Sequence, residues 1–153
     1  MIPYGRQSIS EEDIQAVVEV LRSPWLTQGP MVSRFEDAFR EYCNVGHALA
    51  VNNGTAALHL ACQAIGLGPG DCLWTSPNTF VASANCALYC GATVDFVDID
   101  PQTYNLCPDH LEEKLIEANR NGNLPKVLVA VHFAGQSCEM ERIRQLSHEY
   151  GFY

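Results

Sequence analysis

The sequence has few cationic residues and no long apolar run. Lysine and arginine number 9 against 18 aspartates and glutamates, for a formal net charge of -9 over 153 residues. Such a chain is a poor binder of nucleic acid, because phosphate recognition needs clustered Lys and Arg. No run approaches the ~18 apolar residues of a membrane helix, and no basic segment followed by an apolar one opens the chain. We therefore expect a cytoplasmic protein that binds neither nucleic acid nor membrane.

Metal-binding and nucleotide-binding signatures are also missing. The 7 cysteines include no C-x-x-C pair, and most have an apolar neighbour in the sequence. We interpret them as reduced core residues rather than as zinc ligands or disulfide partners, and no metal site is predicted. The chain contains neither G-x-x-x-x-G-K-[ST] nor G-x-G-x-x-G. Their absence argues against a P-loop nucleotide-phosphate site and against a dinucleotide-binding site.

Short apolar runs alternate with helical patterns along the chain. Alternation of this kind predicts an α/β fold, with a mostly parallel sheet covered by helices on both faces. Strands are predicted at 47–51, 72–75, 93–97 and 126–131, and 151–153 looks like the turn into a fifth. Helices are predicted at 11–22, around 35–42, and at 55–65, 79–90, 108–118 and 139–150. Because such a fold does not normally stop at a core strand, we expect the N-terminal part of a longer protein.

Two strand-to-helix junctions carry groups suited to ligand binding. At Gly54-Thr55 the free N–H groups of the first helical turn, the helix dipole and the Thr hydroxyl form an anion site, although a plain capped turn is the alternative. Phe80 lies at the next such junction, where its ring could lie flat on a planar cofactor or belong to the core. Ligands gather at the carboxyl ends of parallel strands, so both junctions should line one crevice.

Other candidate contacts lie in loops. His132 follows the strand at 126–131, and it is either a base or substrate contact or a structural group. Tyr4 and the segment from Pro24 to Gly29, which contains Trp25, lie outside the sheet pattern. Aromatic residues in such loops cover a ligand or pack as a surface arm.

Taken together, these segments resemble the DegT/DnrJ/EryC1/StrS sugar aminotransferases. The resemblance runs along essentially the whole chain and rests on the stretches 26–30, 53–60, 79–85 and 94–100. The stretches 2–9 and 132–137 look most like one branch of this family. That branch aminates C4 of a UDP-linked 4-keto-6-deoxy-N-acetyl-L-altrosamine in pseudaminic acid biosynthesis.

The resemblance implies an aspartate-aminotransferase-like fold (PLP fold type I), with pyridoxal 5'-phosphate as cofactor and L-glutamate as amino donor. Gly54 and Thr55 would hold the cofactor phosphate, and Phe80 would stack on the pyridine ring. Family sites form at a dimer interface, so a homodimer is implied. The residues that would contact the UDP-sugar substrate are Tyr4, Pro24, Trp25, Leu26, Thr27 and Gly54.

The resemblance also implies that part of the site is missing. Residues 1–30 would form an N-terminal helix and a substrate-covering arm. Residues 31–153 would form the N-terminal part of the PLP-binding α/β large domain, truncated after about residue 153, without its C-terminal part and the small domain. The only lysines are Lys114 and Lys126, and neither stands in the context of the family's Schiff-base lysine. That lysine would lie beyond Tyr153, so residues 1–153 hold no catalytic residue and are expected to be inactive alone.

Two alternatives stay open. A dinucleotide-binding oxidoreductase domain would explain the α/β pattern. This sequence, however, lacks the glycine fingerprint of such domains and the ribose-binding acid after the second strand. A non-catalytic protein that keeps a sugar-nucleotide cleft would show the same pattern.

Overall fold

The computed structural model describes residues 5–153, and Tyr4 therefore lies outside the described residues. The chain divides into two compact units, Met1–Val51 and Asn52–Tyr153, and each is described by itself. Within residues 5–153, no helix has the length and apolar character needed to cross a membrane.

The first unit contains two amphipathic helices, α1 (Glu11–Arg22) and α2 (Pro30–Cys43), both predicted from the sequence. Ser10 starts α1 through a capping box, because its Oγ accepts from the N–H of Asp13 at 3.2 Å while the Asp13 carboxylate accepts from the N–H of Ser10 at 2.8 Å. Pro30 begins α2, where its missing N–H costs nothing. Neither helix buries a residue.

The strand predicted at 47–51 is wrong for the described residues, where this segment has no regular secondary structure. A strand needs a neighbour for its backbone groups, and an apolar run alone does not supply one. The N–H of Ala50 instead donates to a carboxylate oxygen of Glu36 at 2.8 Å.

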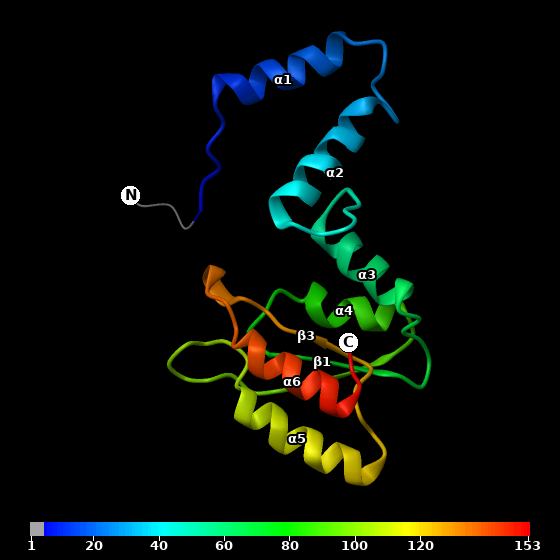
Figure 1. The fold of residues 1–153 in the computed structure, drawn as a ribbon, viewed down its shortest axis with the longest axis vertical. Coiled ribbons are helices and arrows are strands. Elements are labelled where there is room, and N and C mark those ends of the chain that lie inside the picture. Colours follow the sequence, from blue (N-terminus) through cyan, green and yellow to red (C-terminus); the bar gives the residue numbers. More distant parts are fainter. Residues whose placement is uncertain (1–4) are drawn as a thin grey trace. The chain divides into compact units, whose positions relative to one another are not determined.

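The second unit is an α/β sandwich around a parallel sheet of order β2-β1-β3 (Figure 1). Its elements are α3 (Gly54–Ala64), β1 (Cys72–Thr75), α4 (Ala82–Tyr89), β2 (Thr93–Phe96), α5 (Pro108–Asn121), β3 (Val127–Val129), the short 3-10 turn η1 (Phe133–Gly135) and α6 (Met140–Tyr150). Both strand pairings are parallel, with Leu73 opposite Val94 on one side and Val127 on the other. The predicted fold class is confirmed.

Alternate residues of the strands pack into two separate hydrophobic clusters, one on each face of the sheet. Leu73 and Val127 belong to one cluster, which Cys62 of α3 and Cys86 of α4 complete. On the opposite face, Trp74 and Leu128 pack with α5 and α6 through Leu111, Leu115, Ile143 and Leu146. An ion pair between Glu112 and Arg142 also joins α5 to α6. Helices therefore cover both faces of the sheet, as the continuously apolar strand pattern predicted.

Several boundaries differ from those predicted. α4 begins at Ala82 rather than at 79, because the preceding residues form a turn in which the Thr79 and Ser83 hydroxyls share a hydrogen bond of 2.8 Å. α5 continues to Asn121, where Gly122 at φ 69° supplies the left-handed C-cap. Next to β3, Tyr153 donates its N–H to Lys126 O at 3.0 Å and accepts from Leu128 N at 2.8 Å, the bonds of a parallel strand.

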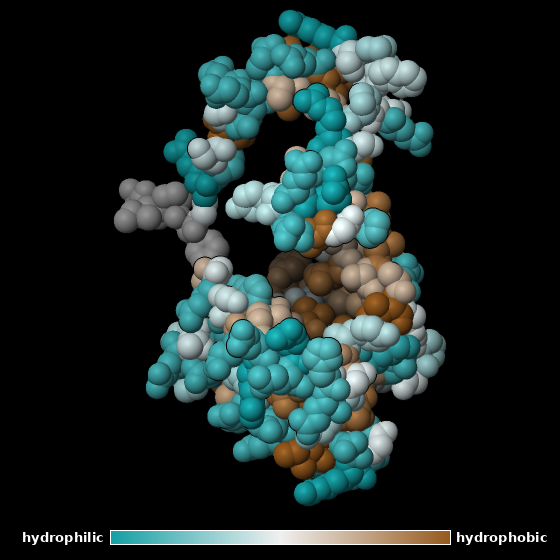
Figure 2. Space-filling view, in the orientation of Figure 1, coloured by the Kyte–Doolittle hydropathy of each residue, from teal (hydrophilic) through white to brown (hydrophobic). Residues whose placement is uncertain are grey.

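The two helical layers expose different surfaces. In Figure 2, apolar residues gather over α3 and α4, whereas α5 and α6 show a mostly hydrophilic surface. Leu60 of α3 and Leu88 and Tyr89 of α4 are 44%, 57% and 55% exposed. The α3–α4 layer is therefore incompletely covered within the second unit.

Candidate functional site

The carboxyl ends of the strands bring three segments to one edge of the sheet. Thr75 and Val129 are register partners at the ends of β1 and β3, and the Thr75 hydroxyl donates to Val129 O at 2.9 Å. Helix α3 runs into β1 through a short connection and packs beside α4, so its N-terminus returns to the same edge. We call this the carboxyl edge, and it comprises residues 53–55, 76–81 and 132–137.

The N-terminus of α3 is open, and we call Gly54 and Thr55 at this position the cradle. The side chain of Asn53 caps the helix by accepting from Ala56 N at 2.8 Å. Within the described residues, the N–H groups of Gly54 and Thr55 have no hydrogen-bond partner. A Cβ added at Gly54 would meet no atom within 4 Å, so open space lies beside this first helical residue. Two free N–H groups at the positive end of a helix of 11 residues fit a phosphate group.

Phe80 is not a core residue of the described chain. It lies between β1 and α4, and it is 75% exposed although its neighbour Ala82 is buried. Its backbone carbonyl accepts from Ser83 N at 3.0 Å, which fixes the turn from which the ring projects. An exposed aromatic face at the carboxyl edge suits stacking on a planar ring.

The predicted substrate-covering segment lies in the first unit. Pro24, Trp25, Leu26 and Thr27 are all exposed between α1 and α2. Ser23 braces this turn, because its Oγ donates to Trp25 O and accepts from Trp25 N, both at 3.2 Å. Gly29 packs closely against Trp25, because a Cβ added to Gly29 would lie 2.9 Å from the Cβ of Trp25. The turn therefore presents Trp25 in a defined backbone conformation.

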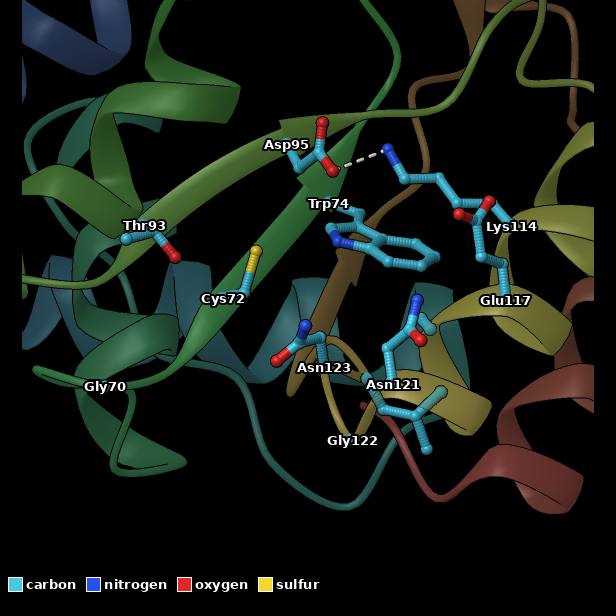
Figure 3. Close-up of a pocket in the computed structure, with 12 residues that line it drawn as sticks. Gly70, Cys72, Trp74, Thr93, Asp95, Lys114, Glu117, Asn121, Gly122 and Asn123 are labelled. Atoms are coloured by element: carbon cyan, nitrogen blue, oxygen red, sulfur yellow. Dashed lines mark ion pairs between the residues drawn. The ribbon is translucent and has the colours of Figure 1, made fainter.

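Lys114 is bound on the α5 face of the sheet. Its Nζ lies 2.7 Å from the Asp95 carboxylate, donates to Phe96 O at 2.6 Å and lies 4.8 Å from the ring centre of Trp74 (Figure 3). Burial raises the pKa of Asp95, but hydrogen bonds from Lys114 and from Phe96 N outweigh it and hold that pKa below its ordinary value. A cavity of about 450 Å³ beside these groups extends toward Gly70 and Asn123.

Lys126 is bound at the opposite end of the sheet, which we call the amino edge (residues 66–72 and 121–126). Its Nζ donates to the Asp71 carboxylate at 2.8 Å and to Gly66 O at 2.7 Å. The hydrogen bond from Lys126, with a second from Gly68 N, lowers the pKa of Asp71. Lys126 therefore lies away from the carboxyl edge, whereas Lys114 is held at the last residue of β2 on the α5 face. That neither is the Schiff-base lysine stays a prediction.

The cysteines form no metal site within residues 5–153, where no group of three His, Cys, Asp or Glu side chains is placed to hold an ion. All 7 are free thiols, of which Cys43 is exposed and Cys62, Cys86 and Cys138 are buried. Burial raises the pKa of the Cys62 thiol to about 12, with contributions from Cys86 and Cys90. Buried thiols of this kind are inert packing groups.

Sequence patterns singled out His132 but missed the residue that organises its surroundings. Asn105 is 4% exposed, and its side chain bonds to the backbone of the segment after His132. The two segments are about thirty residues apart in the sequence. No local pattern pairs them, although a polar residue between apolar neighbours in a loop is a weak signal of a buried amide.

Known proteins of similar sequence and structure were found along the whole chain. The model of the DegT/DnrJ/EryC1/StrS aminotransferase family matches residues 7–153. The spore coat polysaccharide biosynthesis protein SpsC of Bacillus subtilis is 43% identical over 152 residues, which are 99% of this chain and 38% of that protein. The chain thus spans well under half the length of this curated relative.

Solved structures give the same picture. PseC of Helicobacter pylori, described as an aminotransferase involved in the biosynthesis of pseudoaminic acid, superposes with a TM-score of 0.88 at 34% identity, over 98% of this chain and 39% of PseC. The putative sugar aminotransferase Spr1654 of Streptococcus pneumoniae, in its PMP form, superposes with a TM-score of 0.86 at 32% identity, over 97% of this chain and 36% of that one. Its PLP form matches equally well, at 31% identity. The family match over residues 7–153 and this agreement in fold lead to one conclusion: the chain belongs to the DegT/DnrJ/EryC1/StrS aminotransferase family.

Proposed function

We propose that this chain is the N-terminal part of a pyridoxal-phosphate-dependent sugar-nucleotide aminotransferase. The observation that carries the proposal is the open cradle at Gly54 and Thr55, whose free N–H groups match the cofactor phosphate. Membership of the family and the PLP and PMP forms of Spr1654 support the choice of cofactor.

The residues of this chain bind and orient. Gly54 and Thr55 would hold the phosphate, and the exposed ring of Phe80 would stack on the pyridine ring and exclude water from it. When bound, pyridoxal phosphate supplies an electron sink for amino-group transfer. Trp25 and Leu26, 61% and 64% exposed, together with Tyr4, Pro24 and Thr27, are the proposed substrate contacts.

Amino transfer itself needs a lysine amine that moves a proton between substrate and cofactor. Lys114 and Lys126 are held in ion pairs with Asp95 and Asp71. We assign the catalytic lysine to sequence beyond Tyr153, so residues 1–153 alone are proposed to be inactive.

The finer proposal concerns substrate and assembly. The similarity to PseC supports a UDP-linked 4-keto-6-deoxy-N-acetylhexosamine as amino acceptor in the pseudaminic acid pathway, with L-glutamate as donor. The exposed apolar groups of the α3–α4 layer support a homodimer, because a contiguous apolar surface is an association site. The net charge of -9 argues against a nucleic-acid partner, and we propose a cytoplasmic location because the cysteines are free thiols.

The test uses the full-length protein that carries this chain. Gly54→Leu fills the cradle and should lower pyridoxal phosphate affinity at least tenfold, about 1.4 kcal/mol, in a spectroscopic titration. Ala64→Leu adds a similar side chain at the far end of α3, on an exposed residue, and should leave affinity unchanged. Equal affinity in the parent and the Gly54→Leu variant would rule out the cradle as the phosphate site. Failure of the full-length protein to aminate a UDP-linked 4-keto sugar with glutamate would refute the substrate assignment.

A further inference from the structure

The loop after β3 has a strained backbone. Ala134 adopts φ 52° and ψ 24°, and Gly135 follows at φ 84°. In the segment that faces this loop, Tyr104 adopts φ 60°. Left-handed conformations are unfavourable for residues with a Cβ and persist only where surrounding contacts enforce them. The shape of this loop therefore requires an anchor.

Asn105 is that anchor. Its Nδ2 donates to Gln136 O and to Ser137 O, both at 3.1 Å, and its Oδ1 accepts from Phe133 N at 2.9 Å. The side chain is 4% exposed, so water does not replace these bonds. Only an amide offers two donors and one acceptor here, because a carboxylate would face two carbonyl oxygens.

Asn105 is itself held in place by a tight turn. Asp100 Oδ1 accepts from Gln102 N at 2.9 Å and from Thr103 N at 2.8 Å, and Asp100 N donates to Asn105 O at 2.9 Å. The rings of Tyr104 and Phe133 lie 6.2 Å apart and add an aromatic contact between the two segments.

The shape of this loop also determines the hydrogen bonding of His132. At the end of the loop, the N–H of Cys138 donates to His132 Nδ1 at 3.1 Å. Cys138 is buried, and its Sγ donates to Val131 O at 3.2 Å, which fixes its position. Because Nδ1 accepts a hydrogen bond, the neutral imidazole carries its proton on Nε2. His132 is exposed, so this N–H is available to a ligand at the carboxyl edge.

We propose that Asn105 is a positioning residue that holds the 133–137 loop so that His132 donates its Nε2–H to an oxygen of the sugar-nucleotide substrate. The identity of the ligand rests on the proposed function, whereas the tautomer rests on the contacts alone. A neutral donor matches the hydroxyl and keto oxygens of a sugar. The cofactor phosphate is assigned to the N–H groups of Gly54 and Thr55.

The first experiment measures the tautomer in the full-length protein labelled with 15N-histidine. The His132 signals, identified by their loss in His132→Phe, should show a protonated Nε2 and an unprotonated Nδ1. Asn105→Ala should release the loop and give a mixture of tautomers. Asn105→Asp should have the same effect, because a carboxylate would face two carbonyl oxygens. Its matched control is Asn119→Asp, which makes the same amide-to-acid change on an exposed residue of α5 and should leave the signals of the parent unchanged. A protonated Nδ1 in the parent, or an unchanged tautomer in folded Asn105→Ala and Asn105→Asp, would overturn the positioning role.

The second experiment separates binding from chemistry. His132→Phe and Asn105→Ala should each raise the KM for the sugar nucleotide roughly tenfold, with kcat within about twofold and the KM for glutamate unchanged. The double variant should be no worse than either single variant, because both act through one contact. Additive losses, or an unchanged KM, would overturn the contact with substrate. Absence of transamination in the parent would refute the proposed function, and the contact with it, while the tautomer measurement would still decide the role of Asn105.

Discussion

The two ends of the sheet differ in how far their polar groups are satisfied. At the amino edge, Lys126 binds both Asp71 and Gly66, so its charge is paired inside the fold. At the carboxyl edge, Gly54 and Thr55 keep free N–H groups, and Phe80 exposes most of its ring. A fold gains nothing from leaving donors and apolar rings open. The contrast supports the proposal that the carboxyl edge binds a ligand, whereas the contacts of the amino edge stabilise the fold.

This contrast predicts opposite effects for variants at the two ends of the sheet. Changes at the amino edge or in the core beside the sheet should lower the free energy of unfolding and leave cofactor affinity intact in the protein that remains folded. Changes at the carboxyl edge should do the reverse. A variant that alters both properties equally would show that the two ends are not separable.

The largest effect is expected for Trp74→Ala in the full-length protein. Trp74 is 2% exposed in the core beneath Lys114, and its loss should lower the free energy of unfolding by about 3–5 kcal/mol. Trp25→Ala makes the same change at a residue that is 61% exposed, and it should alter stability by less than about 0.5 kcal/mol. Denaturant midpoints measure both. A small effect of Trp74→Ala would contradict its place in the core.

A smaller effect is expected for Phe80 at the carboxyl edge. Phe80→Ala should weaken pyridoxal phosphate binding by about 1 kcal/mol through loss of ring stacking, and Phe80→Tyr should be mild. Stability should hardly change, because the side chain is 75% exposed. Cofactor titration together with unfolding curves tests both points. Equal losses of cofactor in folded Phe80→Tyr and Phe80→Ala would exclude stacking.

The smallest effect is a pH dependence at the amino edge. Hydrogen bonds from Lys126 and Gly68 lower the pKa of Asp71 below its ordinary value of 3.8. A lowered pKa stabilises the fold above pH 3.8, and this contribution is lost as the pH falls through the folded-state pKa. Unfolding free energies measured from pH 6 to pH 2.5 should fall less steeply in Asp71→Asn than in the parent. Parallel curves would show that the Lys126 pair contributes nothing to acid stability.

Local sequence signals predicted the helices and the start of α3 at Gly54-Thr55 well, whereas anion binding there stays a prediction. The ends of α1 and the junction at Gly54-Thr55 depend on residues within a few positions of one another, so the local sequence is enough to predict them. The fold class likewise followed from the alternation of apolar strands with helical patterns, as in β1 and α4.

Features that depend on distant partners could not be predicted. The run at 47–51 is as apolar as the other strands, yet it forms none in the described residues, because a strand depends on a neighbour that local composition does not specify. Spacing alone favours a core position for Phe80, yet its side chain is 75% exposed, because the surroundings of a side chain decide its exposure. The role of Asn105 depends on Gln136 and Ser137, about thirty residues further on.

The strand order β2-β1-β3 has a consequence for synthesis on the ribosome. β1 is central, and its two partners emerge at different times: Thr93 pairs with Cys72 after 21 residues, but Val127 pairs with Leu73 only after 54. Closing the longer loop costs more conformational entropy, and it cannot begin until β3 has left the exit tunnel. One side of β1 therefore stays unpaired while α5 is being made. A pause in translation there would expose this strand to chaperones and to aggregation.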